Sequence, residues 1–216
     1  MSRYQWNPSA GVSGRYRDTR TGRYVAGRVV RAELDTYLAA SDDVAKALAG
    51  QLRDRAISLA DWELAMRAEI KRTHLNAIAL QRGGWANMRP ADFGRSGQII
   101  REQYGYLRNF ANDIATGKQR LDGTLGRRMQ LYIDAGRNSF YQSLHANRKP
   151  EVTHVMSRRT ARDSCRDCIE LDGRWFRIGD PRYMLPGQRQ CNANCQCHET
   201  LGYFGPDDSM VELETI

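Results

Sequence analysis

The chain has 216 residues and a formal net charge of +8, with 33 Lys and Arg residues against 25 Asp and Glu residues. This length suits one medium-sized domain with its own core plus a small module, and no run approaches the roughly 18 apolar residues that would indicate a membrane-spanning helix. The positive charge is compatible with a polyanionic partner, although a solvated basic surface explains it as well.

Residues 1–28 are rich in Gly, Arg and Tyr and poor in aliphatic residues, so they predict a basic, extended arm without a core of its own. Residues 15–25 read RYRDTRTGRYV, which indicates two short strands about a Thr-Arg-Thr-Gly turn. Such an arm could bind nucleic acid by charge and stacking, or it could lie over a neighbouring subunit. The candidate nucleic-acid or partner contacts are Arg15, Arg17, Arg20, Arg23, Arg158 and Arg159.

Residues 29–148 predict an α-helical bundle, because apolar residues recur at spacings of three and four in four or five segments joined by short loops. Helical spacing begins near Val29, and Ser41 is expected to cap a second helix. Ser58 and Asp61 resemble a capping box that opens the most regular segment. His74 lies off the apolar stripe of that segment and is expected at the surface.

Gly, Pro and Asn residues in 83–96 indicate a connector between helices. Three large side chains are expected to pin this connector onto the helices: Trp85, Met88 and Phe93. Ser96 is expected to cap the next helix, which Gly117 would end, and Thr124 to start the last long helix. No strand alternation interrupts the bundle.

All five cysteines lie near the C-terminus, in a C-x2-C pair and, after 22 intervening residues, a C-x3-C-x-C group followed by histidine. Two tight turns that each present thiolates to one side of a tetrahedron are typical of a structural zinc site. The predicted ligands are Cys165, Cys168, Cys191 and Cys195, with Cys197 or His198 as an alternate for either of the last two.

Other uses of these cysteines fit less well. Disulfides would suit a secreted protein, but no signal peptide opens the chain and the number of cysteines is odd. A redox C-x-x-C would require a thioredoxin-like β-α-β setting, and unconnected buried cysteines would not cluster in this way. Four or more protein ligands leave no position for water, so the zinc is expected to be structural rather than catalytic.

Residues 149–205 predict a small β-rich module around this site. Residues 152–156 alternate as in a strand that includes His154, and residues 174–178 indicate another strand. A unit of about fifty residues buries too little surface to be stable by itself, so a metal is the expected staple. Residues 206–216 form an acidic tail that is expected to be extended and could dock on a basic partner surface.

This stretch resembles a known family of phage proteins. Residues 162–168 read RDSCRDC, residues 171–176 read LDGRWF, and Pro186 precedes CNANCQC at residues 191–197. In this order they resemble the C-terminal module of the Mu F-like minor head proteins, the phage head morphogenesis family, whose pattern is C-x-x-C, L-D-G-K/R-x-F, a proline and H-P-x-C-R-C. Here Cys191 replaces the family's histidine, the following gap is one residue longer, and Gln196 replaces arginine.

The resemblance implies a minor capsid protein of a tailed-phage virion that is assembled in the host cytoplasm. Such a protein would act in several copies by binding portal or major capsid proteins, with packaged DNA as a further contact, and would not be an enzyme. The sequence lacks a P-loop, a G-x-G-x-x-G after a strand, an H-E-x-x-H and the zinc deaminase pattern. The alternative is a nucleic-acid-binding zinc protein that uses the arginine-rich arm and the arginines near the cysteines.

Overall fold

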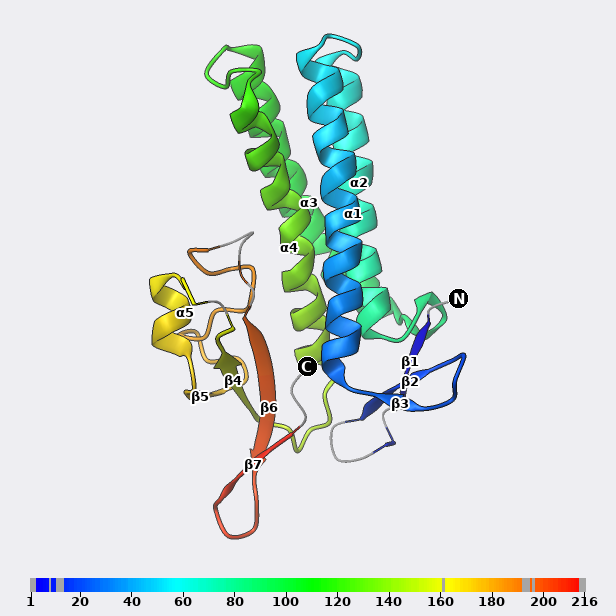
Figure 1. The fold of residues 1–216 in the computed structure, drawn as a ribbon, viewed down its shortest axis with the longest axis vertical. Coiled ribbons are helices and arrows are strands. Elements are labelled where there is room, and N and C mark those ends of the chain that lie inside the picture. Colours follow the sequence, from blue (N-terminus) through cyan, green and yellow to red (C-terminus); the bar gives the residue numbers. More distant parts are fainter. Residues whose placement is uncertain are drawn as a thin grey trace.

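The computed structural model describes residues 3–7, 9–10, 14–160, 162–191, 195 and 197–213. Figure 1 shows long helices side by side, with a small sheet on each side of one end of the bundle. The helical elements are α1 (Gly27–Arg53), α2 (Leu59–Gln81), the 3-10 turn η1 (Trp85–Asn87), α3 (Pro90–Ala115), α4 (Gly123–Asn147) and α5 (Arg166–Leu171). The prediction of a mainly α-helical fold is therefore confirmed. None of the described helices combines the length and apolarity needed to cross a membrane.

The N-terminal segment forms a three-stranded antiparallel sheet in the order β1-β2-β3. Its strands are β1 (Tyr4–Asn7), β2 (Arg15–Asp18) and β3 (Tyr24–Val25). The prediction of two strands about the Thr-Arg-Thr-Gly turn is confirmed, because β2 and β3 pair antiparallel on either side of it. The Asp18 carboxylate stabilises the turn by accepting hydrogen bonds from the backbone N–H groups of Arg20 and Thr21.

The prediction of an extended arm is wrong for the described residues, because this sheet packs against the helices. Tyr4 and Tyr16 are each only 2% exposed and belong to the main core. The Tyr16 hydroxyl donates a 2.8 Å hydrogen bond to the carbonyl oxygen of Gln81 at the end of α2. Gly83 follows with φ +75°, and a Cβ there would lie 2.1 Å from the backbone nitrogen of Trp6, so only glycine allows this close approach.

The docked sheet should contribute measurably to stability. We expect Tyr16→Ala to lower the free energy of unfolding by about 3–5 kcal/mol, as aromatic-to-alanine changes in cores do, and Tyr16→Phe to lower it by about 1 kcal/mol through the lost hydrogen bond. Urea denaturation of the full chain measures both. A Tyr16→Ala protein as stable as the parent would show that the sheet is not held against α2.

The predicted helix starts at Ser41, Ser58 and Thr124 have different outcomes in the structure. Ser58 caps α2 by accepting a 3.1 Å hydrogen bond from the backbone N–H of Asp61, which confirms the capping prediction. Ser41 does not cap a helix, because it is fully buried inside the continuous helix α1. Thr124 is not the first residue of α4, which begins at Gly123 with Asp122 as its cap.

The connector between α2 and α3 is shorter than expected. Helix α3 begins at Pro90, whose fixed φ suits the first turn, so Ser96 lies inside the helix, where its hydroxyl bonds the carbonyl of Phe93. Trp85 is 52% exposed but its Nε1 donates a 3.1 Å hydrogen bond to Oδ1 of Asn76 on α2, which ties the connector to that helix as predicted. Met88 is half-buried and Phe93, inside α3, is 46% exposed. Gly117 follows the end of α3 with φ +73°, as predicted.

His74 is fully buried, not at the surface, because α4 covers its side of α2. Its Nδ1 lies 2.7 Å from the Ser139 hydroxyl of α4, and its Nε2 has no hydrogen-bond partner among the described residues. Gly136 permits this proximity, since a Cβ there would lie 2.7 Å from Cγ2 of Thr73. Burial lowers the pKa of His74 from 6.5 to about 4.

This histidine should make stability depend on pH. The unfolded chain binds a proton at His74 below pH 6.5 while the folded protein does not until about pH 4, so stability falls as the pH drops through that window, by up to about 3 kcal/mol. Urea denaturation at pH 7.5 and pH 4.5 should show a smaller loss in His74→Gln than in the parent. Equal losses in the two proteins would contradict the buried, neutral state of His74.

The second sheet is antiparallel in the order β5-β4-β6-β7. Its strands are β4 (His154–Arg158), β5 (Trp175–Arg177), β6 (His198–Phe204) and β7 (Met210–Glu212). Strands predicted near residues 152–156 and 174–178 are confirmed as β4 and β5, and His154 is a strand residue. Part of the acidic tail forms β7, where Glu212 pairs with Arg158 at 3.0 Å, while residues 214–216 lie outside the described residues.

This sheet is also attached to the bundle by apolar contacts. Val155, Phe176 and Leu201 belong to the same core cluster as the helical residues, and Leu171 at the end of α5 joins them. Strands β4, β5 and β6 therefore pack on the main hydrophobic core that they share with the helices. The five cysteines lie outside this core and form a separate cluster of their own.

Candidate metal centre

The cysteines come from three short segments that meet beside the second sheet. Cys165 is the cap residue of α5 and Cys168 lies one turn inside this helix, while the other cysteines are in the loop after β5 and just before β6. Two groups of three sulfur atoms result, each with all its sulfurs within 4.8 Å of one another. The groups are Cys165, Cys168 and Cys191, and Cys168, Cys195 and Cys197. Cys168 belongs to both and is the centre of the cluster.

The spacing of these sulfurs fits a tetrahedral thiolate site. Four sulfurs bound at about 2.3 Å to one zinc ion lie about 3.8 Å apart, and the Sγ atoms of Cys168 and Cys191 are 3.4 Å apart. A zinc ion bound by Cys168 and the other two sulfurs of one group would take its fourth sulfur from the other group. All five cysteines are free thiols rather than disulfides, which leaves each of them available as a ligand.

A buried arginine supplies positive charge to this cluster. Arg189 is 0% exposed, and its Nη1 lies 3.8 Å from the Cys168 sulfur and 2.8 Å from the Ser157 hydroxyl. Its Nε donates to the carbonyl oxygen of Met184. No carboxylate of the described residues pairs with this guanidinium. A buried charge requires a compensating partner, and a metal centre with four thiolates, which carries net negative charge, would provide one.

A chain of hydrogen-bonded polar groups connects Arg189 with the bundle. Nη2 of Arg189 donates to the Tyr183 hydroxyl at 3.4 Å, and this hydroxyl donates to Oε1 of Glu199 at 2.8 Å. Oε2 of Glu199 lies 2.7 Å from Nε2 of His145 on α4. Glu199 is fully buried on β6. Burial and the Glu199 charge raise the pKa of Tyr183, so the phenol stays protonated and can donate.

Electrostatics favour a thiolate within the cluster. The pKa of Cys195 falls to about 4 because the Cys197 thiol donates a hydrogen bond to its sulfur, with the Gly187 backbone and the Arg189 charge acting in the same direction. Burial raises the pKa of Cys168. Thiolates are the form that binds metal, so the cluster already favours deprotonation at one of its sulfurs.

The structure brings all four predicted ligands and one alternate into the cluster. His198 lies in neither group; it begins β6, and its Nδ1 is buried without a partner among the described residues. Burial lowers the pKa of His198 to about 4. Sequence reasoning missed Arg189 and Glu199. The only available signal for Arg189 was its position two residues before Cys191.

The predicted contact arginines are divided between the two sheets, which lie on opposite sides of the bundle (Figure 1). In the second sheet, Arg158 pairs with Glu212 and Arg159 lies 3.6 Å from the Asp172 carboxylate. In the first sheet, Arg17 donates to the Gly22 carbonyl, and the Arg15 guanidinium lies over the Tyr24 ring at 5.0 Å. The remaining two, Arg20 and Arg23, are exposed.

Comparisons of this chain with protein-family models, with curated proteins and with solved structures found no match.

Proposed function

We propose that this chain is a minor structural protein of a tailed-phage head, in which a structural zinc ion orders the cysteine-bearing segments of a docking module that packs on a helical body. The observation that carries the proposal is the convergence of the cysteine sulfurs around Cys168. The residues that resemble the Mu F-like pattern lie around that cluster, and the role they suggest is binding and positioning rather than turnover.

The residues of the L-D-G-R-W-F motif, residues 171–176, have structural roles that support this proposal. Leu171 is buried at the end of α5, and the Asp172 carboxylate accepts a 2.9 Å hydrogen bond from the Arg159 backbone. Gly173 turns the chain with φ +69°, and Phe176 in β5 joins the main core. Together they connect the cysteine-bearing helix to the sheet, so the motif would fix the position of the metal relative to the bundle.

Helix α5 offers a candidate docking contact. Ile169 is 54% exposed on this helix, next to Cys168. In the proposed role, Ile169→Glu should reduce co-purification with the portal or major capsid protein of the phage that encodes this chain, while zinc content stays unchanged. Leu64→Glu on α2 is the matched control, because Leu64 is 70% exposed and far from the cysteines in sequence. Absence of association between the parent protein and either partner would refute the head-assembly role.

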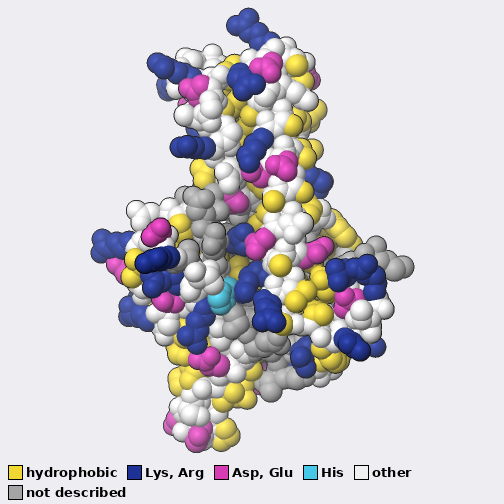
Figure 2. Space-filling view, in the orientation of Figure 1, with side chains coloured by type: hydrophobic (Ala, Val, Ile, Leu, Met, Phe, Trp, Pro, Cys, Tyr) yellow, Lys and Arg dark blue, Asp and Glu magenta, His cyan; other side chains and the backbone are white. Residues whose placement is uncertain are grey.

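Nucleic-acid binding is the second candidate, supported by the net charge of +8 and by the exposed Arg20 and Arg23. Figure 2 shows Lys and Arg side chains spread over this face of the molecule rather than gathered in one stripe, and Arg158 and Arg159 already face carboxylates. These observations favour assembly contacts. A salt titration separates the two, since binding that neutralises several phosphates weakens steeply as salt rises.

A further inference from the structure

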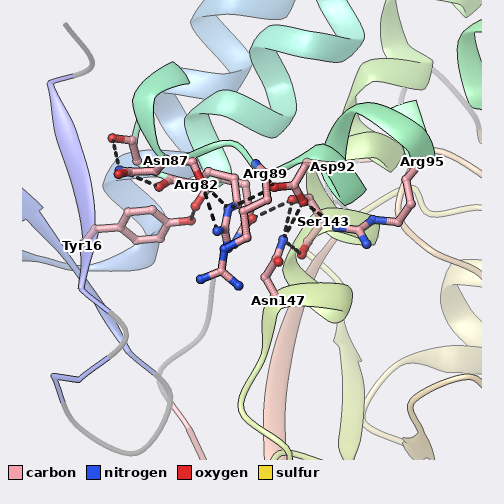
Figure 3. Close-up of polar contacts among 10 residues, drawn as sticks. Tyr16, Arg82, Asn87, Arg89, Asp92, Arg95, Ser143 and Asn147 are labelled. Atoms are coloured by element: carbon pink, nitrogen blue, oxygen red, sulfur yellow. Dashed lines mark hydrogen bonds and ion pairs between the residues drawn. The ribbon is translucent and has the colours of Figure 1, made fainter. Parts of the chain in front are cut away.

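A second site of distinct chemistry lies at the junction of the N-terminal sheet, the α2–α3 connector and the end of α4. A pocket of about 500 Å³ opens there. Its chemistry is set by Trp6, Arg82, Asn87, Arg89, Asn147 and Arg148. Every charged residue among its described lining residues is an arginine. Figure 3 shows how the polar side chains of this junction converge from the sheet, the connector, α3 and α4.

Arg82 is held rigidly at the base of this junction. It is 7% exposed, and its Nε and Nη2 donate to the Asn87 carbonyl oxygen at 3.2 and 3.1 Å. Its nearest carboxylate is that of Asp92, at 3.3 Å. Asp92 also pairs with Arg95 and accepts a hydrogen bond from the backbone N–H of Arg89. One carboxylate is thus divided between two guanidinium groups (Figure 3).

Among the described residues, Asp92 is the only carboxylate that pairs with an arginine of this pocket. Burial lowers the pKa of Arg82, and the charges of Arg89 and Arg95 lower it further, against the opposing effect of Asp92. Arg148 donates to the carbonyl oxygens of Val152 and His145 rather than to a carboxylate, and burial lowers its pKa too. Arg89 forms no ion pair with a described residue. The pocket therefore concentrates cationic groups that an anion would stabilise.

We propose that this pocket binds a phosphate group. Arginine guanidinium groups match the geometry of phosphate oxygens with paired hydrogen bonds, and a dianionic or diester phosphate would compensate charge that Asp92 alone does not. Trp6 provides an aromatic wall against which a neighbouring base could lie. The phosphate could be carried by a free nucleotide or by a nucleic-acid strand. This site is separate from the cysteine cluster and does not depend on the head-assembly role.

Calorimetric titration of the full chain tests the proposal, at low ionic strength in chloride buffer, with inorganic phosphate, thymidine monophosphate and a single-stranded oligonucleotide as ligands. Arg89→Gln should weaken binding about tenfold, which is the effect of losing one charge-assisted contact, and Arg89→Glu should weaken it further. Arg101→Gln is the matched control, because Arg101 is also exposed on the surface, lies within α3 and does not line the pocket.

Each outcome has a defined meaning. Binding of phosphate or the mononucleotide that depends on Arg89 but not on Arg101 supports a site for a free phosphate ester. Binding of the oligonucleotide alone, with the same dependence, supports the pocket and identifies a nucleic-acid strand as the source of the phosphate. Absence of binding by all three ligands, or equal losses in Arg89→Gln and Arg101→Gln, would overturn the proposal.

Discussion

Replacing Cys168 with serine should release the metal and unfold the cysteine-bearing loops while the helices stay folded. Cys168 is the sulfur shared by both groups, so its loss leaves neither group complete. Structural zinc sites of four ligands contribute roughly 10–16 kcal/mol of binding free energy, so losing the central ligand should lower zinc affinity by about two orders of magnitude or more. Competition with a chromogenic chelator measures this change.

The unfolding should be local because β4, β5 and β6 rest on the main core through Val155, Phe176 and Leu201. Amide hydrogen exchange should increase in α5 and in residues 178–191, and far-ultraviolet circular dichroism should retain its helical signal. Cys165→Ser is the matched comparison, since Cys165 belongs to one group only, and should have the smaller effect. A Cys168→Ser protein that binds zinc as tightly as the parent would exclude Cys168 as the central ligand.

Replacing Arg189 with methionine should lower both the stability of the protein and its affinity for zinc. Methionine fills part of the volume but removes the positive charge next to the cluster and the hydrogen bonds to Ser157, Met184 and Tyr183. Losing a buried, multiply bonded arginine should cost at least about 3 kcal/mol of stability. Removing a residue that hydrogen-bonds a metal ligand, as Arg189 does Cys168, typically lowers metal affinity about 10- to 100-fold. Urea denaturation and chelator competition measure the two effects.

Arg182→Met is the matched control for that experiment. Arg182 lies in the same loop and pairs with Asp180 at 2.7 Å, but its side chain is 78% exposed. Exposed ion pairs contribute little to stability, so this variant should behave like the parent. Arg189→Lys should fall between the two, because lysine keeps the charge but not the forked geometry. Equal behaviour of Arg189→Met and Arg182→Met would show that Arg189 does not support the metal centre.

Local sequence signals predicted the elements that depend on nearby residues. Apolar spacing identified the long helices, the Ser58 cap depends on Asp61 three residues away, and the clustered cysteines indicated that sulfurs would converge. Each of these features is decided within a few turns of chain. The prediction that Ser41 caps a helix was wrong because buried residues of the same helix face flank it on both sides, including Leu38 and Ala45. A residue that suits a cap stays inside a helix when the helix packs against its neighbours along its whole length.

Features that depend on long-range packing escaped prediction. His74 is buried only because Gly136, 62 positions later in the chain, lets α4 lie close to α2. The N-terminal sheet is held by the bond from Tyr16 to Gln81, which no local pattern encodes. The sequence likewise could not distinguish Arg189 from the other arginines, because its role follows from the folding of β4 and α5 around it. Surface and interior positions of polar residues therefore required the structure.

X-ray absorption spectroscopy at the zinc edge, combined with metal analysis of the purified chain, tests the central claim most directly. The expected result is one zinc ion per chain with four sulfur neighbours at about 2.3 Å. A protein purified under reducing conditions that carries no metal, or a zinc ion surrounded mainly by oxygen and nitrogen, would contradict a structural zinc ion bound by the cysteines.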